Sequence, residues 1–165
     1  MSIKRIGKHL LQHRWRVRRI FPPQALAVIE RAIKAGEETH SGQVRFAVEG
    51  ALDGKPLLKN QSARERALDI FSQLRIWDTA HNNGVLIYLL LADRQVEIVA
   101  DRGINAKVGA AGWERICKAM QADFKAGNFA GGVVRGIQAV SQQLAAHFPK
   151  HGTGPNELPD KPVVM

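Results

Sequence analysis

Side chains that could bind a metal ion occur in three separate segments of this 165-residue chain. The first segment precedes residues 43–49, in which more and less apolar residues alternate. The second precedes the longest apolar run, 85–92, and the third follows the next apolar run, 95–100. Carboxylate and amide oxygens are the ligands that hard cations such as calcium and magnesium take in proteins. Caps and turns at strand ends explain the same residues without a ligand, so both interpretations stay open. The polar residues of the three segments are Glu37, Glu38, His40, Asp78, His81, Asn82, Asn83, Asp101 and Arg102, of which the cationic Arg102 is not itself a ligand.

An apolar hairpin would bring the second and third segments together. The run Val85–Ala92 is followed by the dipeptide Asp93-Arg94 and then by Gln95–Ala100, which is rich in β-branched residues. Two such runs across a two-residue gap predict a tight antiparallel hairpin in which Leu86 faces Asp101, with the dipeptide as a solvated turn. Each run is far shorter than the roughly 20 residues that span a bilayer. We therefore expect the hairpin to be the buried centre of a sheet.

Apolar spacing predicts helices at 24–40, 62–74, 113–124 and 129–148, and alternation predicts a strand at 43–49. A strand joined to another through a helix normally forms a right-handed parallel crossover. The first strand would then begin at the edge where the hairpin ends, and all three polar segments would converge there. The predicted fold is α/β, a three-layer α/β/α sandwich around a small mixed sheet with a central antiparallel hairpin.

Charge and composition divide the chain into three parts. The net charge is +9, and seven basic residues lie in the first twenty positions, where there is no acid. Residues 1–21 therefore form a basic, amphipathic arm, residues 22–148 form one domain, and the proline-rich residues 149–165 are expected to be a disordered tail. The arm residues that could contact a partner are Lys4, Arg5, Lys8, Arg14, Trp15, Arg16, Arg18 and Arg19.

The basic arm has three possible roles. It could lie on an anionic membrane surface or a membrane protein, it could pack on its own domain, or, less favoured because the rest of the chain is nearly neutral, it could bind nucleic acid. The arm lacks the order of regions of a signal peptide, and no window has transmembrane length. With a single cysteine, Cys117, we expect a cytoplasmic location with peripheral association at the inner membrane.

The familiar enzyme motifs are absent from the sequence. There is no Gly-rich phosphate loop, no paired zinc-binding cysteines, and no HExxH or GxSxG motif. No catalytic residue and no small-molecule substrate can therefore be named.

Several segments resemble the TPM-domain family. They are Glu38-Thr-His-Ser-Gly-Gln-Val-Arg-Phe, Ala67-Leu-Asp-Ile-Phe with Trp77, NNGVLIYLLLADRQVEIVADRGI, and Trp113 with Phe124-Lys-Ala-Gly-Asn-Phe and Gly136-Ile137. The resemblance spans about residues 22–148, and the arm pattern HxxxxWRVRRIFP is similar to that of a short proteobacterial branch labelled as membrane proteins. It implies an α/β/α sandwich, divalent-cation binding at a loop cluster, and the acid phosphatase activity suggested for plant thylakoid members.

The resemblance implies a calcium or magnesium site made by Glu38, Asp78, Asn82 and Asp101. Many family members have Asp-Asn-Gly where this chain has Asn82-Asn83-Gly84, so either Asp78 supplies the missing charge or the metal site is lost. Two functions follow as expectations. One is a binding module at a membrane surface, and the alternative is a metal-dependent phosphatase of low activity.

Overall fold

The computed structural model describes residues 3–11 and 14–165 and contains a four-stranded mixed sheet. The strands are β1 (Gln43–Glu49), β2 (Gly84–Leu90), β3 (Gln95–Ala100) and β4 (Val163–Val164), in the order β3-β2-β1-β4. β1 runs parallel to β2 and β4, and β2 and β3 form the predicted antiparallel hairpin.

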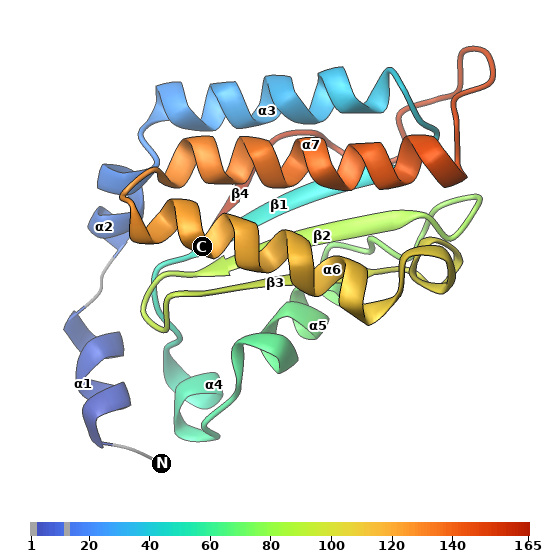
Figure 1. Cartoon of the computed structure of the whole chain (residues 1–165). Coiled ribbons are helices and arrows are strands. Elements are labelled where there is room, and N and C mark those ends of the chain that lie inside the picture. Colours follow the sequence, from blue (N-terminus) through green and yellow to red (C-terminus); the bar gives the residue numbers. More distant parts are fainter. Residues whose placement is uncertain (1–2, 12–13) are drawn as a thin grey trace.

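Helices cover both faces of this sheet (Figure 1). α3, α6 and α7 lie over one face, and α4 and α5 lie over the other, so the predicted three-layer α/β/α sandwich is confirmed. The described helices are α1 (Ile3–Leu11), α2 (Arg14–Ile20), α3 (Pro23–Glu37), α4 (Gly54–Leu58), α5 (Ala63–Gln73), α6 (Arg102–Lys125) and α7 (Phe129–His147).

The central strand β2 is apolar at almost every position because both of its faces are covered. Val85, Ile87 and Leu89 pack into the cluster beneath α3 and α7, whereas the alternate residues pack into the cluster beneath α5. Successive side chains of a strand point to opposite faces, so a strand buried on both sides needs a continuous apolar run.

The hairpin register differs from the prediction by two residues. Val85 pairs with Ala100 and Leu86 pairs with Val99, because the connection comprises four residues, Leu91 to Arg94, rather than two. Leu91 and Ala92 donate their N–H groups to the carbonyls of Glu49 and Gly50, so these two residues do not pair with β3. A shift of two keeps every side chain on its predicted face.

The predicted helices are present, with different limits in one case. α5 begins with a capping box, in which the Ser62 side chain accepts from the Glu65 N–H and the Glu65 carboxylate accepts from the Ser62 N–H. α6 begins at Arg102, well before the predicted position 113, and bends at Gly109, whose φ of 73° is non-helical. A short helix that the apolar spacing did not predict, α4, lies between β1 and α5.

The tail is ordered, contrary to the expectation for 149–165. β4 adds to the free edge of β1, and Leu158 is buried in the cluster beneath α5. The Arg45 guanidinium donates to the carbonyls of Pro159 and Lys161, and the Leu158 N–H donates to Gln43 Oε1 at 2.8 Å. Prolines prevent a helix in this segment, but they are compatible with an extended segment at a sheet edge.

A buried polar cluster connects the sheet to α5. The Arg66 guanidinium donates to both carboxylate oxygens of Glu49 at 2.8 and 2.9 Å, and Tyr88 Oη donates to the same carboxylate at 2.6 Å. The side chains of Arg66 and Glu49 are 14% and 7% exposed. The Arg66 cation compensates the charge of the Glu49 carboxylate, which would otherwise be unfavourable in this buried position.

Replacing Arg66 by methionine leaves the Glu49 carboxylate buried without its cation. We expect the free energy of unfolding to fall by about 3–5 kcal/mol, the range for breaking a buried ion pair from one side. The double variant Arg66→Met with Glu49→Gln should recover most of the loss, because the amide carries no charge and still accepts from Tyr88. Urea denaturation measures the three proteins.

An exposed ion pair provides the control for the Arg66 and Glu49 variants. Lys34 contacts Glu30 at 3.1 Å, with exposed fractions of 58% and 33%. Lys34→Met should cost less than about 1 kcal/mol. Equal losses from Lys34→Met and Arg66→Met would contradict the assignment of the buried pair.

Candidate functional site

The three polar segments of the sequence meet at one edge of the sheet. Gln43 and Gly84 are paired at the start of the parallel strands β1 and β2, and the Asp101 N–H, just after β3, donates to the Gly84 carbonyl at 2.9 Å. The end of α3, the loop before β2 and the start of α6 therefore surround this edge, which we call the rim. The predicted convergence is confirmed.

Two of the four predicted metal ligands lie together at the rim. Asp101 caps α6, with Oδ1 accepting from the Arg102 N–H at 2.7 Å, while Oδ2 is buried and has no partner among the described residues. The Asn82 carbonyl accepts from the Ile104 N–H in the first turn of the same helix at 3.2 Å. Asn82 has a φ of 51°, a conformation in which asparagine is favoured.

The other two predicted ligands are used differently. Asp78 forms an exposed ion pair with Arg75 at 2.8 Å, and Glu38 is the exposed C-cap residue of α3. Within residues 3–11 and 14–165, no group of three or more His, Cys, Asp or Glu side chains is arranged to hold a metal ion. Glu38, Asp78 and Asp101 therefore do not form such a group, and cation binding stays a prediction.

The buried acid at the rim is Glu37 rather than Glu38. Its Oε1 accepts from the Val44 N–H at 2.9 Å. Burial raises the pKa of Glu37 to about 8; the hydrogen bond from Val44 opposes this shift, and the nearby charge of Asp160 adds to it. Ile29, Ile33 and Glu37 follow one another at intervals of four on the buried face of α3. That spacing was the sequence signal that identifies Glu37 as buried.

His40 is a neutral imidazole beside Glu37. Its Nδ1 lies 3.1 Å from the Gly42 carbonyl, which can only accept, so Nδ1 carries the proton and Nε2 is left as an acceptor. Nε2 is buried and has no partner in the described part of the chain. Burial lowers the pKa of His40 to about 4, so the ring stays uncharged at neutral pH.

A cavity of about 290 Å³ opens beside these two side chains, and the tail forms its outer wall. Its lining includes Glu37, His40, His81, Lys150 and Glu157. No sequence pattern indicates that the tail residues belong to this site, because their position depends on strand β4. The arrangement places a neutral imidazole and a protonated carboxyl beside the cavity, a pair that suits hydrogen bonding more than binding of a cation.

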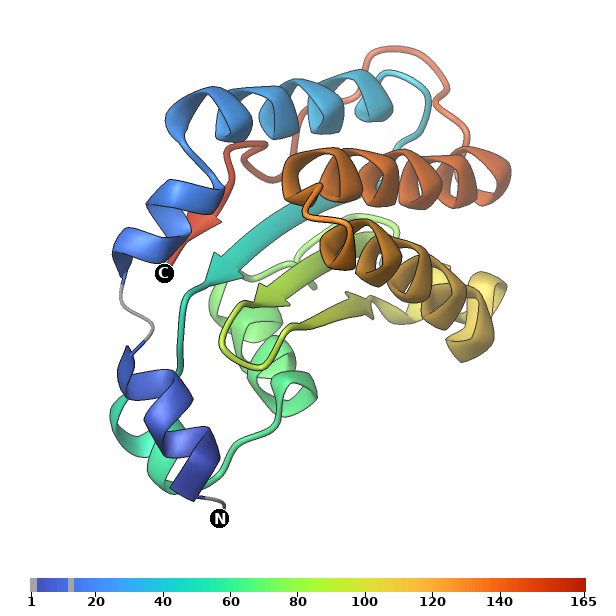
Figure 2. The ribbon, with the colours of Figure 1, turned by 60° about the vertical axis from the view of Figure 1, so that its left-hand side comes forward.

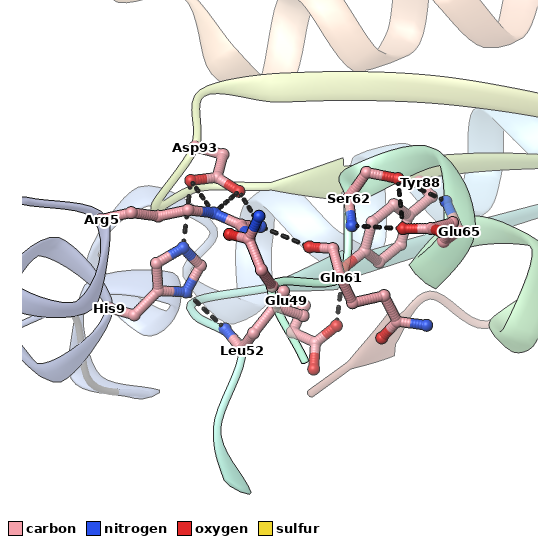
Figure 3. A network of polar contacts seen from close by, with 10 residues as sticks. Arg5, His9, Glu49, Leu52, Gln61, Ser62, Glu65, Tyr88 and Asp93 are labelled. Carbon is pink, nitrogen blue, oxygen red and sulfur yellow. Dashed lines mark hydrogen bonds and ion pairs between the residues drawn. The ribbon is translucent and has the colours of Figure 1, made fainter. Parts of the chain in front are cut away.

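At the opposite end of the sheet, two arm residues converge on the hairpin turn (Figure 3). Arg5 Nη2 lies 2.8 Å from Asp93 Oδ2, and His9 Nε2 lies 3.0 Å from Asp93 Oδ1. His9 Nδ1 accepts from the Leu52 N–H at 2.8 Å, so the proton of a neutral His9 sits on Nε2 and is donated to Asp93. Burial alone would raise the pKa of Asp93, but the hydrogen bonds from Arg5 and His9 outweigh it and lower that pKa.

Two sequence interpretations change as a result. Arg5 was expected to contact a partner and instead binds its own domain, and Asp93 was expected to be a solvated turn residue and instead holds the arm. The alternative in which the arm packs on its own domain is correct for α1. The side chains of Lys8 and Arg14 lie outside the described part of the structure.

α2 presents opposite properties on its two sides. Val17 and, just after the helix, Phe21 are fully buried in the core beneath α3 and α7. Trp15 is 56% exposed, and Arg18 and Arg19 are also exposed. Figure 2 shows both arm helices along one side of the molecule, in dark blue and blue.

Comparison with known proteins agrees with this architecture. A family model described as the TPM domain matches residues 18–143. This chain belongs to the TPM-domain family. The BA42 protein of the psychrophilic bacterium Bizionia argentinensis, solved by NMR, is similar to it at 32% identity with a TM-score of 0.76, over 86% of this chain and 93% of that one.

A more distant solved structure supports the fold alone. The N-terminal domain of a protein from P. gingivalis is 20% identical, with a TM-score of 0.63, over 80% of this chain and 83% of that one. No curated protein matches this TPM-domain chain. None of the described helices is long and apolar enough to cross a membrane.

The buried acid of the rim predicts a pH dependence of stability. Between the usual glutamate value of 4.5 and about 8, the folded chain keeps a proton on Glu37 that the unfolded chain has released. Stability from this group is therefore complete below pH 4.5 and is lost as the pH rises through about 8. Glu37→Gln keeps the acceptor for Val44 and cannot titrate.

We expect Glu37→Gln to exceed the wild type in stability by more than about 1 kcal/mol at pH 8.5 and to differ little near pH 5. Thermal and urea unfolding across this range measure the difference. The exposed neighbour provides the control, and Glu38→Gln should follow the wild-type curve. A Glu37→Gln protein that loses stability with pH as steeply as the wild type would contradict the assignment.

Proposed function

We propose that this TPM-domain protein is a binding module that attaches to anionic membrane surfaces through its amino-terminal arm. The observation that carries the proposal is the anchoring of α2 in the core by Val17 while Trp15, Arg18 and Arg19 face outward. A tryptophan with neighbouring arginines is the combination found where proteins meet the headgroup layer, because the indole is amphipathic and the cations attract anionic lipids.

The geometry of α2 supports one continuous contact surface. Residues three and four apart on a helix are neighbours, so Trp15, Arg18 and Arg19 share one side. Each basic residue near an anionic headgroup contributes roughly 1 kcal/mol. Seven of the nine excess charges lie in the first twenty residues, so attraction to an anionic surface would orient the molecule with the arm toward it.

The α1 segment has a different part in this proposal. Ile3 is 86% exposed and Lys4 is exposed, whereas Arg5 is held by Asp93. The ion pair fixes the helix on the domain while Ile3 remains available to the acyl boundary. Binding would therefore use a preformed surface and require little ordering of the chain.

Vesicle binding tests this function directly. Wild type should sediment with vesicles of phosphatidylcholine containing a third phosphatidylglycerol, and binding should weaken as NaCl is raised. The variant Trp15→Ala with Arg18→Gln and Arg19→Gln should bind at least about 30-fold more weakly, because it lacks two lipid-facing charges and the indole.

A charge-matched variant controls for non-specific attraction. Arg31→Gln with Lys34→Gln removes the same two charges from exposed positions of α3 and should bind vesicles like the wild type. Equal binding by the arm variant and the α3 variant would contradict the proposal. So would equal binding to neutral vesicles, and tighter, salt-sensitive binding to duplex DNA would assign the arm to nucleic acid instead.

A divalent cation at the rim is a second candidate, favoured by the buried, unpartnered Asp101 Oδ2 beside Asn82. Calcium, magnesium or manganese should then raise the melting temperature, because a ligand that binds only the folded state stabilises it by mass action. Asp101→Asn should abolish the shift while preserving the helix cap, and Asp78→Asn should leave it intact. An acid phosphatase-like activity depends on the same ion, so the absence of a shift with all three ions would remove both candidates.

A further inference from the structure

A second cavity lies between α2, the hairpin turn and the α6–α7 connection. Figure 1 shows these three elements at the end of the sheet opposite the rim. Its volume is about 550 Å³, within the range of small-molecule sites in proteins. A further hollow of about 650 Å³ adjoins it and shares Arg16, Ile20 and Phe129. The hollow is also lined by Trp15 and Arg19, so the cavity and the hollow lie next to each other along α2.

Five apolar side chains line this cavity, beside the polar side chains of Gln95 and Gln121. Leu89, near the end of β2, and Leu91, the first residue of the hairpin connection, are buried, and Ile20 of α2 closes another side. Phe124 and Phe129 stack with their ring centroids 5.4 Å apart and an interplanar angle of 12°. Both rings are only partly buried, so aromatic surface faces the space.

Cations surround the mouth of the cavity. Arg16 comes from α2, Arg94 from the hairpin turn and Lys125 from the end of α6. No carboxylate in residues 3–11 or 14–165 forms an ion pair with any of the three, and the one acid in the lining, Asp93, is bound by Arg5 and His9. Three positive side chains from separate elements therefore surround an apolar space without internal neutralisation.

We infer that this cavity binds a single-chain anionic amphiphile, with the alkyl chain over Leu89, Leu91 and the two phenylalanines and the carboxylate or phosphate head between Arg16, Arg94 and Lys125. An anion satisfies the cations by charge-assisted hydrogen bonds, and an alkyl chain covers apolar surface that water solvates poorly. The inference goes beyond attachment to a membrane surface, because it concerns one monomeric molecule in a defined cavity.

Calorimetric titration of the full chain with monomeric decanoate, dodecanoate and tetradecanoate tests the site. We expect one molecule bound per chain and an affinity that rises about 15-fold for each two methylenes buried. Dodecyl phosphate should bind like dodecanoate, and dodecyltrimethylammonium should bind at least tenfold more weakly. Binding of the cationic and anionic amphiphiles with equal affinity would overturn the inference.

Variants of the cavity test where the anionic head and the alkyl chain of the ligand bind. Arg94→Asn with Lys125→Gln should weaken dodecanoate binding at least tenfold, and asparagine accepts the positive φ of 54° at position 94. The α3 variant Arg31→Gln with Lys34→Gln should bind like the wild type. Gln121→Trp should fill the cavity from its half-buried wall position and remove binding, with folding checked by circular dichroism.

Failure of this inference is distinguishable from failure of the proposed function. No binding of any of the three fatty acids, or an unchanged affinity in Gln121→Trp, would overturn the amphiphile site even if vesicles bind the arm normally. Conversely, dodecanoate binding that is weakened by Arg94→Asn with Lys125→Gln and removed by Gln121→Trp supports the site even if the protein does not bind vesicles.

Discussion

Burial of β2 on both faces is the constraint on which the rest of the structure depends. A strand apolar at almost every position must be covered from above and below, which requires α3, α6 and α7 on one side and α4 and α5 on the other. The same strand pairs with β1 in parallel on one side and with β3 in antiparallel orientation on the other. These two pairings place one set of loops at the rim and another at the hairpin turn, so the two candidate sites lie at opposite ends of a single strand.

Much of this architecture could be predicted because it depends on local patterns. The unbroken run from Val85 identifies the central strand, and Ser62 with Glu65 identifies the start of α5. The turn was harder to predict, because Asp93 and Arg94 suit a two-residue connection by type. The register is decided instead by the bonds of the preceding two residues to the carbonyls of Glu49 and Gly50. Such non-local bonds have no signature within the hairpin itself.

The sites were predicted less completely for the same physical reason. The convergence of the three polar segments at the rim follows from the sheet topology alone. Whether each acid is buried depends instead on the face of the helix that it occupies, and this difference separates buried Glu37 from exposed Glu38. The tail contributes a strand through only two residues and a few carbonyl contacts, too little for a periodic pattern. The pairing of Arg5 with Asp93 joins residues 88 apart in sequence, and nothing in the basic arm distinguishes Arg5 from its neighbours.

The two arm helices are held on the domain by different forces. α1 depends on the charged contact of Arg5 with Asp93, which is partly open to solvent, whereas α2 depends on Val17 and Phe21 within the core. Dissolved ions screen the first attachment and leave the second nearly untouched. A rise in ionic strength therefore weakens the attachment of α1 to the domain more than that of α2, so the same electrolyte acts unequally on two neighbouring helices.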